Sequence, residues 1–177
     1  MKMNLPNKLT ILRMILVPLF VVTILCWNRY VALAIFIIAS VTDSLDGKIA
    51  RKYNLITNFG KFMDPLADKM LVTSALLAFV QLGILPSWIA MIVVARDLAV
   101  DGLRMMAASK GVIMAAGWSG KIKTAVTIVC ICTMMTPLGE IVLGKISINA
   151  VCAGLILLLN VISFTDYFSK NWKILKD

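Results

Sequence analysis

The chain has 177 residues, of which 60% are hydrophobic, and it carries a formal net charge of +9. A soluble domain of this length is nearer half apolar, and the basic residues here lie between long hydrophobic runs, which favours a membrane surface over a nucleic-acid partner. The chain has no histidine, so acid–base or metal chemistry has to rest on carboxylates. Composition therefore predicts a single membrane domain over residues 1–177.

Six runs are long enough to cross a bilayer, because a spanning helix needs about 20 mostly apolar residues. In chain order they cover residues 9–27, 30–52, 60–82, 86–108, 119–136 and 147–168. Shorter segments with polar residues, Gly or Pro join these runs, and the longest connections fall at 109–120 and 136–147. We therefore expect an all-α integral membrane bundle of six transmembrane helices.

The distribution of Lys and Arg predicts how these helices are oriented. If the N-terminus is cytoplasmic, 15 of the 18 basic residues fall at inner helix ends and in inner loops. Only Arg29 and Lys145 then fall on the outer side, and Arg96 lies within a span. Basic residues accumulate on the cytoplasmic side of membrane proteins. Both termini are therefore expected in the cytoplasm, in a multi-pass protein of the cell membrane.

Six of the nine acidic residues fall inside the second, third and fourth predicted spans, and four of them lie on two consecutive spans. Asp43 and Asp46 are three residues apart, and Asp64 and Asp68 are four apart, so each pair shares one helix face. A short loop joins the two helices, which makes them antiparallel neighbours. The four carboxylates can thus converge near the cytosolic interface, and ionisable groups within a membrane are functional candidates by default.

Four ionised carboxylates at one place repel each other unless some are protonated or cations lie among them. Oxygen ligands without histidine or thiolate suit Mg²⁺, Mn²⁺ or Ca²⁺, and four aspartates can hold two divalent ions. Gly47 and Gly60 flank the cluster and allow close approach by a ligand, and Arg51 could clamp a phosphate. The alternative is purely structural neutralisation by nearby basic residues: Lys48, Arg51, Lys61 and Lys69.

The pattern Asp43-x2-Asp46-Gly47-x2-Ala50-Arg51-x8-Gly60-x3-Asp64-x3-Asp68 is similar to the signature of the CDP-alcohol phosphatidyltransferases. All eight fixed positions are present at the right spacing, and the six-span layout matches over the whole chain. In that family an alcohol displaces CMP from a CDP-linked donor. The resemblance implies that Asp43, Asp46, Asp64 and Asp68 bind two divalent cations, Mg²⁺ or Mn²⁺. It also implies that Asp68 is the catalytic base that deprotonates the acceptor hydroxyl.

The same resemblance implies where the CDP moiety binds. Its site would be lined by small or polar residues of the motif: Gly47, Ala50, Arg51 and Gly60. Asn7 and Thr10, together with Arg13, would approach the nucleotide from the first helix. The family resemblance further implies a homodimer surrounded by membrane lipid, with the active site facing the cytoplasm.

Three further segments resemble the family members that join sn-glycerol 3-phosphate to CDP-diacylglycerol and so form phosphatidylglycerophosphate. They are NLPNKLTILRMILVP at 4–18, ARDLAVDGLR at 95–104 and GKIKT at 120–124. Such an acceptor is a dianion and requires a basic pocket, for which four residues are available: Arg96, Arg104, Lys121 and Lys123. Lys121 and Lys123 are two residues apart and would not share one helix face. Asp101 adds a negative charge nearby and could pair with Arg104 or Arg96.

Three alternatives stay open from the sequence. The first keeps the chemistry and changes the acceptor to serine, inositol phosphate or phosphatidylglycerol. The second is a divalent-cation carrier whose carboxylates form a transport site, which would need access from both faces. The third is a membrane scaffold without catalysis, which would tolerate Asp64→Asn.

Overall fold

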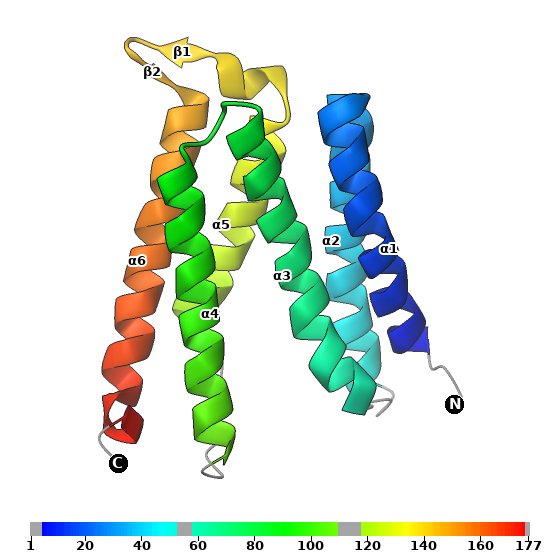
Figure 1. Ribbon diagram of the computed structural model, residues 1–177, viewed down its shortest axis with the longest axis vertical. Helices are drawn as coiled ribbons and strands as arrows, with labels where there is room; N and C mark the ends of the chain where they lie inside the picture. The colour runs from blue at the N-terminus through cyan, green and yellow to red at the C-terminus, as the bar shows by residue number, and fades with distance from the viewer. Residues whose placement is uncertain (1–4, 53–57, 110–117, 176–177) are drawn as a thin grey trace. The chain divides into compact units, whose positions relative to one another are not determined.

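The computed structural model describes residues 5–52, 58–109 and 118–175, with the side chains of most of them, and each of the six predicted runs is a helix (Figure 1). The chain forms two compact units, residues 1–82 and 83–177. The first unit holds α1 (Leu5–Cys26), α2 (Arg29–Lys52) and α3 (Asn58–Gln81). The second holds α4 (Ser87–Ser109), α5 (Trp118–Met134), the 3-10 helix η1 (Pro137–Glu140), the strands β1 (Val142–Leu143) and β2 (Ile146–Ser147), and α6 (Ile148–Leu175).

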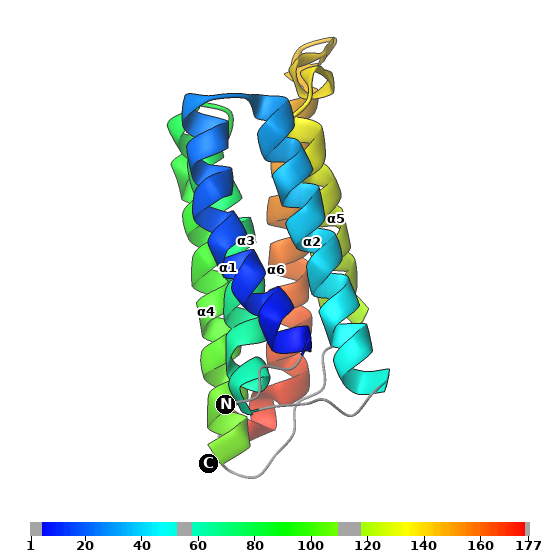
Figure 2. The same cartoon turned by 90° about the vertical axis from the view of Figure 1, so that its right-hand side faces the viewer.

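In the first unit, only Trp27 and Asn28 separate α1 from α2. Asn28 caps the start of α2, because its Oδ1 accepts hydrogen bonds from the backbone N–H groups of Tyr30 (2.8 Å) and Val31 (3.3 Å). So short a connection makes the two helices antiparallel neighbours, as Figures 1 and 2 show. Because α1 packs against α3 as well as α2, it is the central helix of this unit.

Helix α1 has two contrasting faces. Side chains at intervals of three or four residues are buried: Thr10, Arg13, Val17, Phe20 and Ile24. Large aliphatic side chains at the same intervals are exposed: Leu12, Ile15, Leu19 and Val22. The buried face includes the ring of Phe20, whose centroid lies 5.7 Å from that of Phe36 on α2. A helix that buries one face and still exposes a row of aliphatic side chains on the other is suited to a hydrocarbon environment.

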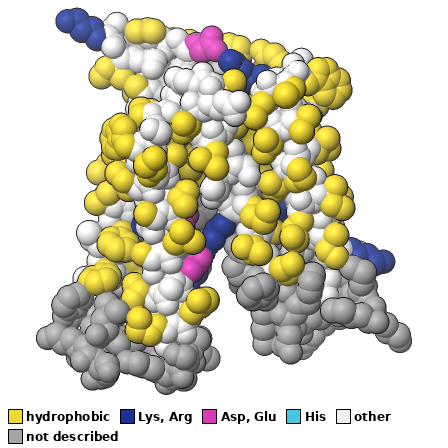
Figure 3. Space-filling view, viewed as in Figure 1, with side chains coloured by type: hydrophobic (Ala, Val, Ile, Leu, Met, Phe, Trp, Pro, Cys, Tyr) yellow, Lys and Arg dark blue, Asp and Glu magenta, His cyan; other side chains and the backbone are white. Residues whose placement is uncertain are grey.

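The second unit repeats this division on α6, which packs against α4 and α5. Its exposed row is aliphatic: Val151, Leu155, Leu158 and Ile162. Its buried row is largely polar: Ile156, Asn160, Ser163 and Tyr167. Figure 3 shows apolar side chains spread along the visible surfaces of the helices. Asn160, Ser163 and Tyr167 therefore face other helices, while a row of aliphatic side chains faces outward.

The connection between α5 and α6 contains structure that the sequence analysis did not predict. We expected a simple connection over 136–147, whereas the chain forms η1 and then an antiparallel hairpin in which Val142 is opposite Ser147. The hairpin turns through two residues, and the first of them, Gly144, has φ +70°, a conformation that favours glycine. Strands of two residues are too short to show the alternation by which strands are recognised in a sequence.

Two helices in the described part of the chain are long and apolar enough to cross a membrane, over Asn7–Cys26 and Ile148–Ser169. Within the described part of α3, the apolar stretch Lys69–Gln81 is shorter than either of these. Helix α5 has 17 residues, and α2 and α4 carry several charged residues each. An all-α fold with six helices is thus confirmed, whereas six membrane crossings and a single domain over 1–177 stay predictions.

Candidate active site

The eight motif residues lie on α2 and α3, which contact each other and both contact α1. The side chain of Asp43 is described. The side chains of the other seven lie outside the described residues: Asp46, Gly47, Ala50, Arg51, Gly60, Asp64 and Asp68. Among the described side chains there is no group of three or more potential metal ligands. The convergence of the four carboxylates therefore remains a prediction, supported by the adjacency of their two helices.

Asp43 forms an ion pair with Arg13 of α1, in which Nη1 of Arg13 donates to Oδ1 of Asp43. The arginine side chain is completely buried, whereas the aspartate side chain is 35% exposed. A buried guanidinium requires an anion beside it, because the loss of hydration otherwise costs several kcal/mol. The sequence analysis considered only basic residues of α2 and α3 as partners for the aspartates. The observed partner is 30 residues away in the chain, beyond the reach of local spacing arguments.

Asn7, Thr10 and Arg13 follow each other at intervals of three and share one face of α1. All three are buried, with exposed fractions of 4%, 0% and 0%. Because α1 packs on α2 and α3, this face points into the first unit, where the motif lies. The ion pair to Asp43 places one member of the row directly beside a motif residue. The row is thus in the region where the resemblance puts the nucleotide.

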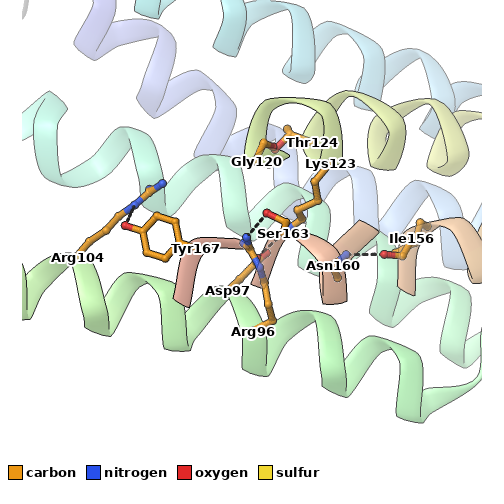
Figure 4. Close-up of polar contacts among 10 residues, drawn as sticks. All are labelled: Arg96, Asp97, Arg104, Gly120, Lys123, Thr124, Ile156, Asn160, Ser163 and Tyr167. Carbon is orange, nitrogen blue, oxygen red and sulfur yellow. Dashed lines mark hydrogen bonds and ion pairs between the residues drawn. The ribbon is translucent and has the colours of Figure 1, made fainter. Parts of the chain in front are cut away.

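A second polar cluster lies within the other unit, where α4, α5 and α6 meet (Figure 4). We call it the Asp97 cluster, and it comprises Arg96, Asp97, Lys123 and Ser163. Nη1 of Arg96 donates to Oδ1 of Asp97 at 2.8 Å, and Nζ of Lys123 donates to the same oxygen at 2.5 Å. Nη2 of Arg96 donates to Oγ of Ser163 at 2.6 Å. Three helices are therefore joined through one arginine and one aspartate.

The other two predicted acceptor-site cations lie apart from this cluster. Nε of Arg104 donates to Oη of Tyr167 at 3.2 Å, and the guanidinium lies 5.5 Å from the centroid of the same ring. Nζ of Lys121 lies 5.1 Å from the ring centroid of Trp118, on the exposed side of α5. Lys123 is by contrast only 7% exposed. The two lysines thus face different ways, as their spacing predicts, and the structure brings together only Arg96 and Lys123 of the four.

Several polar residues of this unit were not identified from the sequence. On α6, Ser163 and Tyr167 bind the two arginines, and Asn160 lies one turn before Ser163. On α5, Thr127 lies one turn after Lys123. Oγ1 of Thr127 and Oδ1 of Asn160 are buried and have no hydrogen-bond partner among the described residues. Polar residues at intervals of three or four in the second half of an otherwise apolar helix were the available signal on α6.

A comparison with known protein families identifies the class of this protein. The chain matches the CDP-alcohol phosphatidyltransferase family over residues 3–165, so it belongs to that family. The CDP-diacylglycerol–glycerol-3-phosphate 3-phosphatidyltransferase of Bacillus subtilis (strain 168) is 41% identical over 188 aligned residues, covering 98% of this chain and 97% of the relative. A probable phosphatidylglycerophosphate synthase of Mycobacterium tuberculosis (strain ATCC 25618 / H37Rv) is 40% identical and covers 94% of this chain and 81% of its own length. The Escherichia coli (strain K12) protein with the same name as the Bacillus relative is 36% identical, with coverages of 76% and 78%.

Proposed function

We propose that this protein transfers the phosphatidyl group of CDP-diacylglycerol to sn-glycerol 3-phosphate, forming phosphatidylglycerophosphate and releasing CMP. The observation that carries the proposal is the similarity to the Bacillus relative, which extends over nearly the whole of both chains. The motif at 43–68 and the segments at 95–104 and 120–124 all lie inside the family match. In the reaction, a bond forms between the acceptor oxygen and the phosphatidyl phosphorus, and the bond from that phosphorus to the CMP oxygen breaks.

The donor set on α2 and α3 fits the divalent cations that the family implies. It consists of carboxylates on two contacting helices, in a chain without histidine, and hard oxygen ligands are what Mg²⁺ and Mn²⁺ prefer. The one described member, Asp43, already has a cation beside it in Arg13. Held by Asp43, Asp46, Asp64 and Asp68, two such ions would neutralise the donor diphosphate and stabilise CMP as it leaves.

The protein's own groups then have distinct tasks. Asp68 accepts the proton of the acceptor hydroxyl as its oxygen attacks phosphorus, which is general-base catalysis by a carboxylate. The nucleotide lies along the small or polar residues of the motif and the buried row of α1: Gly47, Ala50, Arg51, Gly60, Asn7 and Thr10. The absence of bulky side chains at three of these positions leaves room for the cytosine and the ribose.

The acceptor phosphate binds at the basic groups of the second unit. Arg96 and Lys123 are the best candidates, because their charged groups are within hydrogen-bond distance of one shared oxygen, that of Asp97. A phosphate oxygen at that position would meet both cations. Arg104 and Lys121 contribute positive charge from the neighbouring turns, since Arg104 lies on α4 two turns beyond Arg96.

The proposed topology is six membrane crossings, with both termini and the active site on the cytoplasmic side of the cell membrane. It is supported by the distribution of basic residues and by the exposed aliphatic rows of α1 and α6. The charged segments of α2, α3 and α4 lower their mean hydropathy, and in this proposal their charges face protein groups rather than lipid. A homodimer is proposed from the family resemblance alone.

The proposal is tested by CMP release from CDP-diacylglycerol, with Mg²⁺ or Mn²⁺ and one acceptor at a time. We expect release with sn-glycerol 3-phosphate and loss of nearly all activity in Asp68→Asn. Glu140→Gln, an exposed carboxylate in η1, is the matched control and should keep full activity. Release only with serine, inositol phosphate or phosphatidylglycerol would replace the proposed acceptor. Metal flux into proteoliposomes without CMP release would instead identify a cation carrier.

A further inference from the structure

We propose that Asp97 is an internal anion that occupies the acceptor-phosphate site of the empty enzyme and thereby selects for dianionic acceptors. The inference rests on the proposed function, because it concerns the pocket that receives glycerol phosphate. Asp97 has the opposite charge to the residues that such a pocket requires, yet it lies between the two best candidates. Its position therefore calls for an explanation beyond phosphate binding by Arg96 and Lys123.

The geometry of the Asp97 cluster is that of an occupied anion site. Arg96 and Lys123 come from different helices and both donate to Oδ1 of Asp97, at 2.8 and 2.5 Å (Figure 4). One carboxylate oxygen thus stands where a phosphate oxygen would stand. A hydrogen bond from Arg96 to Ser163 on α6 holds the guanidinium in this orientation. The site is consequently formed before any acceptor arrives.

Burial shows why an internal anion is needed. The side chains of Arg96 and Lys123 are 12% and 9% exposed, whereas that of Asp97 is 22% exposed. Two buried cations without an anion would repel each other and would lack most of their hydration. Asp97 removes this penalty in the absence of substrate. Because it is the more accessible member, an incoming anion competes with it directly.

The cluster also keeps capacity for a larger anion. Among its four residues, the two cations outnumber the one carboxylate. In addition, Nε of Arg96 is buried and has no hydrogen-bond partner among the described residues. A phosphate dianion has three terminal oxygens and twice the charge of a carboxylate, so it can meet both cations and this remaining donor. The carboxylate of Asp97 accepts both of these hydrogen bonds at Oδ1 and makes none to Nε of Arg96.

Selection follows from the exchange. A dianion interacts more strongly with the two cations than the Asp97 carboxylate that it displaces. An uncharged alcohol has no charge with which to replace that interaction. Asp97 thus disfavours an uncharged, unphosphorylated acceptor such as glycerol, in the way that a repulsive element contributes to specificity. The correct acceptor also binds more weakly than it would without Asp97, because it has to displace this carboxylate from the two cations.

The experiment compares the wild type with Asp97→Asn by titrating inorganic phosphate against the thermal unfolding temperature in detergent, without CDP-diacylglycerol. Removal of the competing charge should lower the phosphate concentration for half-maximal stabilisation by at least about fivefold. The KM for sn-glycerol 3-phosphate should fall by a similar factor while kcat changes little. Asp166→Asn removes a carboxylate from the same unit that accepts a hydrogen bond from Ser119, and it should change neither quantity.

An unchanged or weaker response to phosphate in Asp97→Asn would overturn the inference and make Asp97 a residue that merely holds the cations in place. If Asp97→Asn does not fold, Asp97→Ser serves the same comparison, because it also removes the charge and keeps a polar group. The phosphate titration needs no turnover. Tighter phosphate binding in a protein that lacks transferase activity would therefore support the internal anion and overturn only the proposed function.

Discussion

The ion pair between Arg13 and Asp43 connects α1 to α2, and its contribution to stability can be measured by a double-mutant cycle. The variants are Arg13→Met, Asp43→Asn and the two together. Breaking a fully buried pair by removing one member costs about 3–5 kcal/mol, because the remaining charge is left without compensation. Here Asp43 is 35% exposed, so water can solvate the carboxylate once Arg13 is gone. We therefore expect Arg13→Met to lower the free energy of unfolding by about 2 kcal/mol, which is less than for a fully buried pair.

The double variant leaves neither charge behind, so its loss should be smaller than the sum of the single losses. We expect a coupling energy of about 1–2 kcal/mol, within the range found for contacting residues. The assay is thermal unfolding in detergent with EDTA, which keeps divalent cations away from Asp43. For a chain of this size about 1 kcal/mol corresponds to about 2–4 °C, so Arg13→Met should lower Tm by roughly 4–8 °C.

Adding Mn²⁺ extends the test to the proposed metal site. A divalent cation bound beside Asp43 would supply part of the positive charge that Arg13→Met removes. The difference in Tm between this variant and the wild type should therefore narrow when Mn²⁺ replaces EDTA. The reasoning would be refuted if the double variant lost as much unfolding free energy as the two single variants together, to within about 0.5 kcal/mol. Such a result would show that the two side chains do not stabilise each other.

Three further predictions concern single positions. Ser163→Ala removes the acceptor of the 2.6 Å hydrogen bond from Arg96, and the KM for sn-glycerol 3-phosphate in the CMP assay should rise about three- to tenfold with kcat nearly unchanged. Asn160→Leu replaces a fully buried amide whose Oδ1 has no partner among the described residues. The free energy of unfolding should therefore stay the same or rise by up to about 1 kcal/mol. A decrease of more than about 2 kcal/mol would contradict this prediction. Gly83→Ala places a Cβ at a residue with φ +71°, where no other atom lies within 4 Å of it. Thermal unfolding should therefore show a free energy of unfolding lower by about 1 kcal/mol, from backbone strain alone. Gly83→Asn should lower it by less.

The helices were predictable because each is a long apolar run that ends at a polar or turn-forming segment. The expected span at 86–108 is the helix Ser87–Ser109, and the one at 30–52 is Arg29–Lys52. The hairpin after η1 was not predictable, because two-residue strands have no recognisable pattern. The family was predictable from eight fixed positions on two helices, and the comparisons confirm it.

The side-chain partners were less predictable than the helices. Spacing along one helix separated Lys121 from Lys123 correctly, since it depends only on helical geometry. The partner of Asp43 is on another helix, and no local pattern links it to Arg13. Likewise, the sequence predicted Arg96 and Lys123 as phosphate ligands and Asp101 as a possible partner of Arg96, whereas both cations bind Asp97. Contacts between helices depend on their rotation about their own axes, which hydrophobic runs do not determine.

The pairing of Arg13 with Asp43 also has a consequence for biogenesis. Arg13 is translated 30 residues before its counter-ion, within a helix that is long and apolar enough to cross the bilayer. An arginine in a lone inserting helix is unfavourable, by about 2.5–3.5 kcal/mol at the helix centre and by less toward an end, where Arg13 lies. Entry of α1 into the lipid phase is therefore favoured once α2 has been synthesised, so that both helices partition together with Arg13 paired to Asp43, as a hairpin folded at Trp27 and Asn28.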